Sequence, residues 1–588
     1  MSKKTQVVPQ KNIKENKQFD YALLILLFGF AVMFSFSKIN GEDDIFWHMS
    51  TGKYILETKT VPSQDVFGFV TQGQQWIPFE WAWDVIAYSV FTSTGFIGLY
   101  IFNAILIALM LWLFYLLLRK FEVPVTLSIF YLLILILGVR YRLEIKPHIF
   151  SYLFLVLTLY LIVNYKYFGK SPKILYFIPP IFMVWANMHM GVLAGVLLLG
   201  IFLVSDIIDF IKEKKKDGLK YSLPVFIASL LFMLINPNHI MTYIYSFQHT
   251  QMKMIDQIYE WMSPFNSNFL GKLYNLIYIG FVIGILFVYA EYKKKKDWFV
   301  ILLYLLFAIY SLRAIRFTVD FIFVASLFLF VALYHLLKKE STLNFIKNNT
   351  YVKLFLGVIL VWFLLWTPND KLYRALGFQK SFGTGIYEET FPIKMFDFMK
   401  ENKITEIGDR PFHTFDYGGY FTWNFPGKKN FIDSRNLNDS IWYSFVSIYN
   451  KQQGYQNLIN EYKFDYFAIF QTAVAQAAIL GNTNAIPKIL ESSIISYLSS
   501  KPDEWKLVFW DDKSFLFVKN EDKFKDIISK YEYKYFTPYN LYNKGKMIQD
   551  AKNSKDESLT KEVARKNLED PRGYFVYLYK STFEKRTK

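Results

Sequence analysis

The 588-residue sequence contains no cysteine. This absence excludes disulfide bonds, a thiolate nucleophile and zinc sites built on thiolates. The sequence also lacks a Walker motif, a nucleotide-binding glycine fingerprint and an internal repeat, so a reaction driven by cytoplasmic ATP is not indicated. About twenty polar residues precede the first apolar run and no small-residue cleavage site follows it, so we do not expect a cleavable signal peptide.

Apolar and aromatic residues are abundant instead. The chain is 53% hydrophobic and 20% aromatic, with a mean hydropathy of +0.20, which is too apolar for a soluble protein of this size. The formal net charge is +17 and the isoelectric point about 9.3. A basic chain can bind nucleic acid, but here the lysines cluster between apolar runs, a pattern that sets membrane orientation. We therefore expect no nucleic acid partner.

Eleven apolar runs have about the 20-residue length that a membrane-spanning helix needs. They cover residues 20–38, 96–118, 124–140, 148–166, 173–188, 191–211, 222–236, 271–290, 297–312, 316–337 and 351–367. With eleven spans, the lysine-rich connections all fall on one side, which the positive-inside rule identifies as the cytoplasm. The tail 1–19 is then cytoplasmic, and residues 39–95 form a large first outer loop. Everything after residue 368 lies outside.

The outer ends of these spans carry acidic, basic and histidine side chains. They include Asp43, Asp44, His48, Glu80, Trp81, Arg140, Arg142, Lys146, His189, Glu260, Arg313 and Arg316. One interpretation is that each is a solvated helix end without a function. The other is one outward-facing site, because Arg140, Arg142 and Lys146 break the positive-inside rule and are best explained by an anionic ligand such as a lipid phosphate.

Residues 368–520 lose the long apolar runs and predict a small outer α/β domain. We expect strands at 412–416, 429–433 and 463–470, a hairpin at 505–519 turning at 511–514, and helices around 441–462. The Gly418-Gly419 pair and Asp433–Arg435 are best explained as a tight turn and a buried ion pair. Residues 521–588 are charged and helical in pattern, and we expect a peripheral tail there.

An outward-facing transferase cannot use nucleotide sugars, so an activated donor must come through the lipid. A polyprenyl-phosphate sugar meets that need. Its transfer requires a carboxylate that takes the acceptor proton, cations or a metal that stabilise the leaving phosphate, and a groove for the prenyl chain. We assign the base to Asp44, the better candidate of the adjacent pair with Asp43.

His48 follows Asp44 by four residues and shares its face if the segment is helical. It could orient the carboxylate, hold a divalent cation with Asp44 or bind the donor phosphate. The phosphate candidates are Arg140, Arg142, Lys146, Arg313 and Arg316, of which the last two would share a helix face. Glu80-Trp81 and Glu260-Trp261 each suit sugar binding by hydrogen bond and ring stacking, or alternatively anchor the chain at the interface.

At these residues the chain resembles the GT-C superfamily of membrane glycosyltransferases, whose mark is an acidic residue in the first outer loop. It is most similar to a bacterial group with Asp-x-Trp-Trp-His-Leu-x-x-Gly, Pro-x-x-Asp-x-Phe-Ser and Glu-Trp in that loop. The matching residues are Asp44, Trp47, His48, Gly52, Pro62, Asp65, Phe67, Glu80 and Trp81. Later matches are Lys146 to Ser151, Trp185, Asn187, His189, Gly191, Asn236-Pro237, Glu260 to Pro264, Gly418 to Tyr420 and Phe431 to Arg435.

Phe46, Lys146 and His239 depart from the group's tryptophan, arginine and glycine. Lysine lacks the bidentate phosphate contact of arginine. The resemblance implies an α-helical polytopic membrane protein of the bacterial inner membrane with a C-terminal extracytoplasmic α/β domain. It implies an inverting transfer of a sugar from a polyprenyl phosphate to a glycan, lipid or protein. The alternatives are a transporter or flippase of a lipid-linked or anionic solute and a non-catalytic scaffold for envelope assembly.

Overall fold

The computed structural model describes residues 17–41, 44–214, 217–338, 349–378, 380–479, 482–543, 545–555 and 557–584. The chain divides into two compact units, each assembled from three segments. The helical unit comprises Met1–Lys38, Thr94–Ile240 and Asp256–Thr384. The α/β unit comprises Ile39–Ser93, Met241–Ile255 and Gly385–Lys588.

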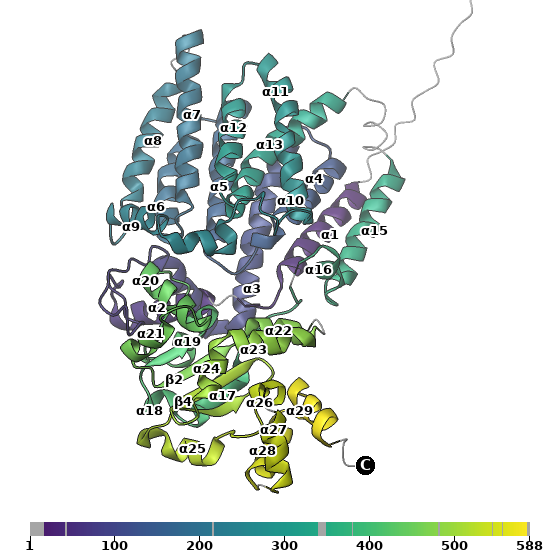
Figure 1. Ribbon diagram of the computed structural model, residues 1–588. Coiled ribbons are helices and arrows are strands. Elements are labelled where there is room, and N and C mark those ends of the chain that lie inside the picture. Colours follow the sequence, from purple (N-terminus) through teal and green to yellow (C-terminus); the bar gives the residue numbers. More distant parts are fainter. Residues whose placement is uncertain are drawn as a thin grey trace, which may run out of the picture. The chain divides into compact units, whose positions relative to one another are not determined.

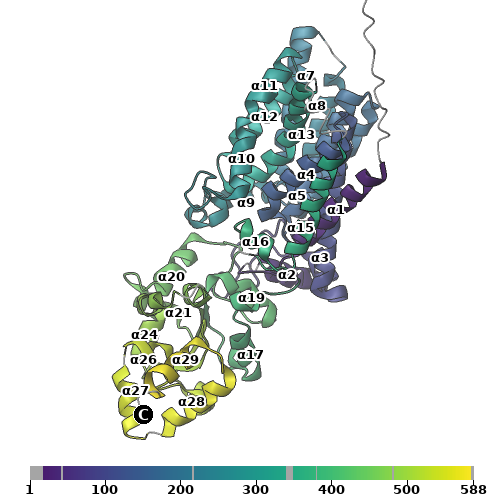
Figure 2. The ribbon, with the colours of Figure 1, turned by 90° about the vertical axis from the view of Figure 1, so that its right-hand side faces the viewer.

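The helices of the helical unit run alongside one another as a bundle (Figures 1 and 2). Among the described residues, seven helical stretches are long and apolar enough to cross a membrane, and three shorter apolar helices accompany them. They coincide with the predicted spans, except that the run 173–188 becomes a short 3-10 segment followed by α6. The helices are α1 (Lys17–Ser35), α3 (Trp81–Lys120), α4 (Val125–Val139), α5 (His148–Phe168), α6 (Ile178–Met188), α7 (Val192–Glu213), α8 (Leu219–Met233), α10 (Leu273–Ile283), α11 (Ile285–Lys294), α12 (Trp298–Ser311), α13 (Thr318–Leu337), α15 (Thr350–Trp366) and α16 (Lys371–Ala375).

Helix α13 is the centre of the bundle. In its most apolar window 89% of the residues are buried, against 33% in the window that covers α10 and α11. Large apolar side chains on peripheral helices remain exposed, among them Ile25, Phe355 and Leu365 at 67–72%. A helix that is apolar all round and only partly covered by protein fits a lipid environment. The polytopic membrane fold predicted from the sequence is thereby confirmed.

Helix α3 contains a break at Gly95. Its 40 residues would extend about 60 Å as a straight helix, twice the thickness of a bilayer core of about 30 Å. At Gly95 the backbone leaves helical geometry, with φ 66° and ψ −162°. The residues before the break belong to the α/β unit and those after it to the helical unit.

The α/β unit contains a four-stranded sheet in the order β1-β2-β4-β3. β1 (Pro411–His413) and β2 (Tyr466–Phe470) are parallel, whereas β4 (Ser514–Lys519) is antiparallel to β2 and to β3 (Trp505–Trp510). The predicted hairpin is confirmed: the side chain of Asp511 accepts hydrogen bonds from the backbone N–H groups of Lys513 and Ser514 and so closes its turn.

The α/β unit also contains short helices. They are α2 (Asp44–Thr58), α9 (Met241–His249), α17 (Ile393–Glu401), α18 (Ile404–Ile407), α19 (Gly418–Asn424), α20 (Asp439–Tyr449), α21 (Tyr455–Tyr462), α22 (Thr472–Ile479), α23 (Ile486–Ser492), α24 (Ile494–Ser500), α25 (Lys525–Tyr531), α26 (Pro538–Asn543), α27 (Gly545–Asn553), α28 (Glu557–Glu569) and α29 (Tyr574–Tyr579). The C-terminal segment shares the sheet's hydrophobic core, to which it contributes the fully buried Phe536, Ile548 and Phe575.

One predicted strand is wrong. Residues 429–433 form a loop that meets the first outer loop at a single bridge between Gly68 and Asn430. Side chains replace the missing ladder: the N–H of Phe431 donates to Nε2 of His413 at 3.0 Å. Burial lowers the pKa of His413 to about 4, so the ring is neutral at pH 7 and can accept this bond. The segment is as buried as a strand, but apart from the bridge at Asn430 it has no ladder of backbone hydrogen bonds with the rest of the described chain.

Candidate functional site

Asp44 is the first residue of α2. A carboxylate in the first turn is favourable because the helix N-terminus carries a partial positive charge. Its Oδ1 accepts a hydrogen bond of 2.6 Å from the hydroxyl of Ser434, a residue 390 positions later. Asp43, the neighbouring candidate, lies outside the described residues.

His48 lies one turn further along α2 and is 2% exposed. Its Nδ1 donates to Oδ1 of Asp84 at 2.5 Å, and its Nε2 faces the carboxylate of Glu80 at 3.7 Å. Glu80 and Asp84 are four residues apart at the start of α3, and this spacing brings both toward one imidazole. Trp81, the other candidate here, opens α3 and is partly exposed.

Asp44 and His48 therefore have different partners, although both lie at the start of α2. In the parts of the chain that the structure describes, no group of three histidine or acidic side chains is arranged to hold a metal ion.

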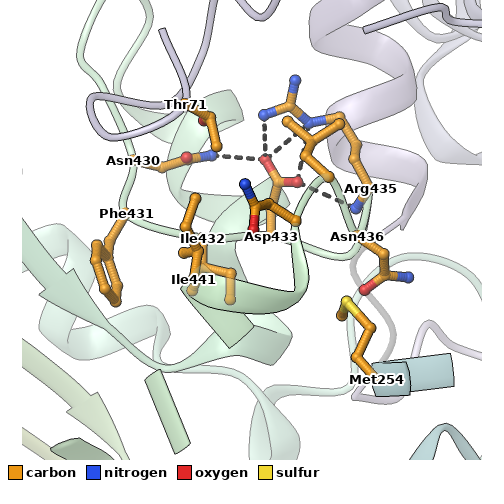
Figure 3. A pocket seen from close by; sticks show the side chains of 11 residues that line it. Thr71, Met254, Asn430, Phe431, Ile432, Asp433, Arg435, Asn436 and Ile441 are labelled. Atoms are coloured by element: carbon orange, nitrogen blue, oxygen red, sulfur yellow. Dashed lines mark hydrogen bonds and ion pairs between the residues drawn. The ribbon is translucent and has the colours of Figure 1, made fainter. Parts of the chain in front are cut away.

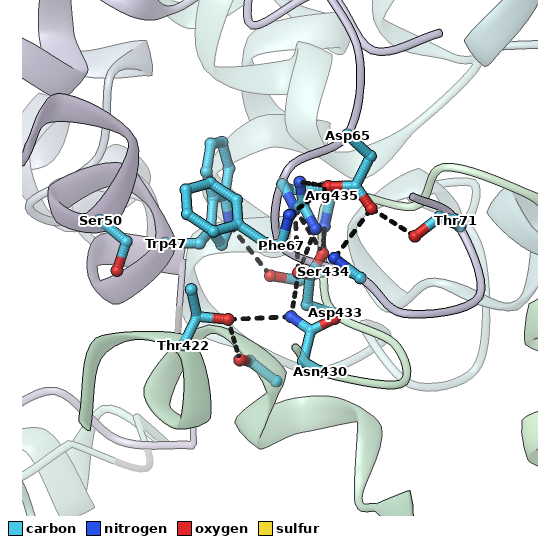
Figure 4. Close-up of polar contacts among 12 residues, drawn as sticks. Trp47, Ser50, Asp65, Phe67, Thr71, Thr422, Asn430, Asp433, Ser434 and Arg435 are labelled. Carbon is cyan, nitrogen blue, oxygen red and sulfur yellow. Dashed lines mark hydrogen bonds and ion pairs between the residues drawn. The ribbon is translucent and has the colours of Figure 1, made fainter. Parts of the chain in front are cut away.

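The loop that carries Ser434 is fixed by a buried ion network, shown in Figure 4. Arg435 donates to Oδ2 of Asp433 at 2.7 Å and to Oδ1 of Asp65, in the first outer loop, at 2.6 Å. Its guanidinium also stacks on the rings of Phe67 and Trp76, 5.1 and 4.5 Å from their centroids. All three charged side chains are buried, so the predicted Asp433–Arg435 pair is confirmed and gains a third member.

Asp65 is held in its charged form. Burial alone would raise the pKa of Asp65, but the charge of Arg435 and the hydrogen bonds from Thr71 and from the backbone of Phe67 outweigh burial and lower this pKa. A small pocket borders the same network and is lined by Thr71, Asp433 and Asn436 among others (Figure 3). Its volume of about 20 Å³ is room for about one water molecule, so it does not accommodate a sugar.

The candidates of the helical unit gather around Glu260, in the 3-10 segment η4 (Tyr259–Trp261). Its carboxylate accepts from Arg142 and, at 2.9 Å, from Arg316. Burial alone would raise the pKa of Glu260, but Arg316, Arg142 and Lys146 together hold it well below its usual value. Three cations thus surround one carboxylate. The guanidinium carbon of Arg316 lies 4.5 Å from the ring centroid of Trp261. Both residues of the Glu260-Trp261 pair therefore bind Arg316.

Arg142 is fixed on every side. Besides Glu260, its guanidinium donates to the hydroxyl of Tyr152 at 3.4 Å and to Nδ1 of His148 at 3.3 Å. Nε2 of His148 donates in turn to the carbonyl of Arg142 at 2.6 Å. These contacts set the direction of the guanidinium before any ligand arrives.

His189 lies beside this cluster, with its ring centroid 6.3 Å from that of His148. Its Nδ1 accepts from the N–H of Gly191 at 3.0 Å and from the hydroxyl of Ser151 at 2.7 Å. The hydrogen of the neutral ring is therefore on Nε2. A Cβ on Gly191 would lie 2.2 Å from Oγ of Ser151, which explains the glycine of this motif.

Two arginine candidates lie apart from Glu260. Arg140 is 1% exposed and packs against the rings of Phe34 and Tyr373, 5.0 and 5.3 Å from their centroids. Arg313 is exposed in the bend after α12, and Arg316 lies in the separate 3-10 segment η5 (Ile315–Phe317). The extended backbone of Ala314 interrupts the helix between them. The expectation that Arg313 and Arg316 share a helix face is wrong.

Sequence reasoning gave no individual role to Asp84, Ser434, Tyr152 or His148. Asp84 had a usable signal, because it follows Glu80 at helical spacing in a motif already singled out. Ser434 had none, since a lone serine between two charged residues is common and its partner is 390 positions away. The site candidates fall into two sets, Asp44, His48, Glu80 and Trp81 in the α/β unit and the remainder of the described ones in the helical unit.

Comparisons with known proteins place the fold. No protein-family model matches the chain, and no curated protein matches it. Among solved structures, the oligosaccharyltransferase AglB from Archaeoglobus fulgidus, in complex with an inhibitory peptide and a dolichol-phosphate, matches with a TM-score of 0.60 and 12% identity over 97% of this chain and 86% of that one.

The apo form of an oligosaccharyltransferase from Archaeoglobus fulgidus matches with a TM-score of 0.56 and 11% identity over 98% of this chain and 88% of that one. ArnT from Cupriavidus metallidurans bound to undecaprenyl phosphate gives 0.48 and 11% over 87% and 99%. At these identities the match concerns the fold, which extends over nearly the whole chain. The chain is thus a multi-pass membrane protein whose fold is similar to that of the archaeal oligosaccharyltransferase, as the resemblance found in its sequence led us to expect.

Proposed function

We propose that this protein is a membrane glycosyltransferase that moves a sugar from a polyprenyl-phosphate-linked donor to a glycan, lipid or protein acceptor outside the bacterial inner membrane. The observation that carries the proposal is the cluster of cations at Glu260, whose carboxylate binds both Arg142 and Arg316 and lies within the electrostatic reach of Lys146. Cations beside apolar helices suit a lipid phosphate. The GT-C fold, shared with an archaeal enzyme solved with a dolichol-phosphate, adds support.

The donor phosphate would bind to this cationic cluster. Arg316 is more available to a ligand than Arg142, because the side chain of Arg316 is 19% exposed and that of Arg142 only 9%. Arg142, held by His148 and Tyr152, supplies a guanidinium of fixed direction. Preorganised cations stabilise the charge that develops on a leaving phosphate without having to rearrange.

The acceptor would be activated by Asp44. The hydroxyl or amide group of the acceptor attacks the anomeric carbon of the donor sugar and forms the new glycosidic bond on the face opposite to the phosphate. The bond between the anomeric carbon and the phosphate oxygen breaks, and the electron pair leaves with the polyprenyl phosphate. The acceptor proton passes to the Asp44 carboxylate. Glu80, next to the imidazole of His48, would bind sugar hydroxyls.

A reconstituted assay tests the proposal. Mass spectra of the membrane glycans of a deletion strain and its parent first identify the missing modification. The purified protein in nanodiscs is then given labelled undecaprenyl-phosphate sugars as donors and the glycans of the deletion strain as acceptors. Asp44→Asn should lower transfer at least roughly a hundredfold, whereas Glu57→Gln, an exposed change on the same helix, should not. Full transfer by Asp44→Asn would remove Asp44 as base. Solute accumulation in sealed vesicles without a covalent product would favour a transporter.

A further inference from the structure

The hydroxyl of Ser434 connects two residues of α2. It donates to Oδ1 of Asp44 at 2.6 Å and accepts from the indole N–H of Trp47 at 3.2 Å. Figure 4 shows Ser434 facing Trp47 from the loop that follows Asp433. Trp47 is 9% exposed, so water has little access to the hydrogen bond between Trp47 and Ser434.

The donor and the acceptor of each hydrogen bond in the series Trp47, Ser434, Asp44 follow from the chemistry of the three side chains. An indole nitrogen can only donate, whereas a serine hydroxyl donates one hydrogen and accepts others. Because Trp47 occupies an acceptor position of Ser434, the serine hydrogen is free to turn toward the carboxylate. Hydrogen bonds in such a chain polarise and strengthen one another. The result is that Oδ1 of Asp44 accepts a hydrogen bond from a hydroxyl group that is itself held in place by Trp47.

The loop is rigid enough to fix Ser434 in place. On either side of it, Asp433 and Arg435 belong to the buried ion network with Asp65. Close packing adds a second constraint, since a Cβ on Gly418 would lie 2.0 Å from the carbonyl oxygen of Ile432. A displacement of Ser434 would therefore disturb buried charges and a tight backbone contact.

We infer that Ser434 is a positioning residue that orients the Asp44 carboxylate for proton abstraction, with Trp47 directing its hydroxyl. This inference rests on the proposed function, in which Asp44 is the base. It gives the C-terminal domain a part in the chemical step: the domain supplies the group that aims a carboxylate of the first outer loop. The buried network Asp65–Arg435–Asp433 then serves as the support of that group.

Steady-state kinetics test the role. Ser434→Ala should lower kcat about tenfold with little change in the KM for the donor or for the acceptor. Ser434→Thr, which keeps a hydroxyl group, should retain most of the wild-type kcat. Trp47→Phe should lower kcat by a smaller factor. In an Asp44→Asn background Ser434→Ala should cause no further loss of residual transfer, because the carboxylate it orients is gone. A loss that multiplies with that of Asp44→Asn, or an unchanged kcat, would overturn the inference.

An infrared arm separates this inference from the proposed function. The difference spectrum between the wild type and Asp44→Asn identifies the carboxylate stretch of Asp44. Ser434→Ala should shift that band, whereas Ser434→Thr and the exposed control Ser500→Ala should not. If the band does not move, the contact is absent and the inference fails even if transfer is observed. If the band moves but the wild type transfers no sugar, the proposed function fails and the chain of hydrogen bonds stands without a catalytic role.

Discussion

Glu260 is the residue on which the cationic cluster depends. Its single carboxylate binds Arg142 and Arg316, so it neutralises part of the charge that would attract a phosphate. It also keeps two guanidinium groups close together that would otherwise repel each other. Structure and ligand binding therefore make opposite demands on this residue.

Glu260→Gln should separate these demands. Without the negative charge the protein should melt at a temperature lower by about 2–5 °C, because two close cations lose their common partner. Undecaprenyl phosphate should bind roughly threefold to tenfold tighter, because it no longer competes with the carboxylate.

Thermal unfolding and lipid titration in detergent measure the two effects, with Asp256→Asn as the control in the preceding segment. Weaker lipid binding by Glu260→Gln would indicate that the phosphate does not use this cluster.

Asp65 allows a test by pH. Its pKa is lower in the folded protein than in the unfolded chain, so its contribution to stability is present above the unfolded pKa of about 3.9 and fades as the pH falls toward the folded pKa. Asp65→Asn should lower the free energy of unfolding by about 2 kcal/mol at pH 7 and by progressively less below about pH 4.

Tryptophan fluorescence during denaturant unfolding at several pH values measures this difference. The exposed Asp503→Asn should have little effect at any pH. A cost for Asp65→Asn that stays constant down to pH 3 would mean that the charge of Asp65 is not what stabilises the network.

At the scale of elements, the break in α3 depends on Gly95. Its φ of +66° lies in the left-handed region, which costs other residues about 1–2 kcal/mol. Gly95→Ala should therefore lower the melting temperature. Gly29→Ala should leave it unchanged or raise it, because Gly29 lies inside α1 with open space around it and alanine favours helices. Equal melting temperatures of the two variants would argue against a strained position at Gly95.

The elements that the sequence predicted well are those with a long periodic or apolar signal. The membrane helices and the hairpin 505–519 are of this kind. The wrong strand at 429–433 shows the limit: a short apolar run is buried in either case, and only its partners decide whether it pairs as a strand. Likewise, Ala314 carries no sequence signal that would end a helix between Arg313 and Arg316, and tertiary contacts there override propensity.

At the scale of the whole molecule, the predicted orientation can be mapped directly, because the chain has no cysteine of its own. Ser500→Cys, in the C-terminal domain, should react with a membrane-impermeant maleimide on spheroplasts. Lys294→Cys, at the end of α11, should react only after lysis. Both positions are exposed, so access depends on the side of the membrane. Reaction of both before lysis, or of neither, would contradict the eleven-span topology.

Local patterns indicated which residue types would matter, but not how they pair. Asp44, His48, Glu80 and Glu260 stand in motifs that a reader of the sequence can find. Their partners come from distant parts of the chain, such as Ser434 for Asp44 and Arg316 for Glu260. Such pairs depend on the complete fold, which a single sequence does not reveal.

The 370-residue separation between Asp65 and Arg435 has a consequence for biosynthesis. At 5–20 residues per second, a ribosome needs roughly 20–75 s to cover that distance. For that time the loop that carries Asp65 has been synthesised, but the counter-ion of its carboxylate has not. A chain that stops before Arg435 leaves Asp65 without this counter-ion, so we expect its early loop to be less stable than in the full-length protein.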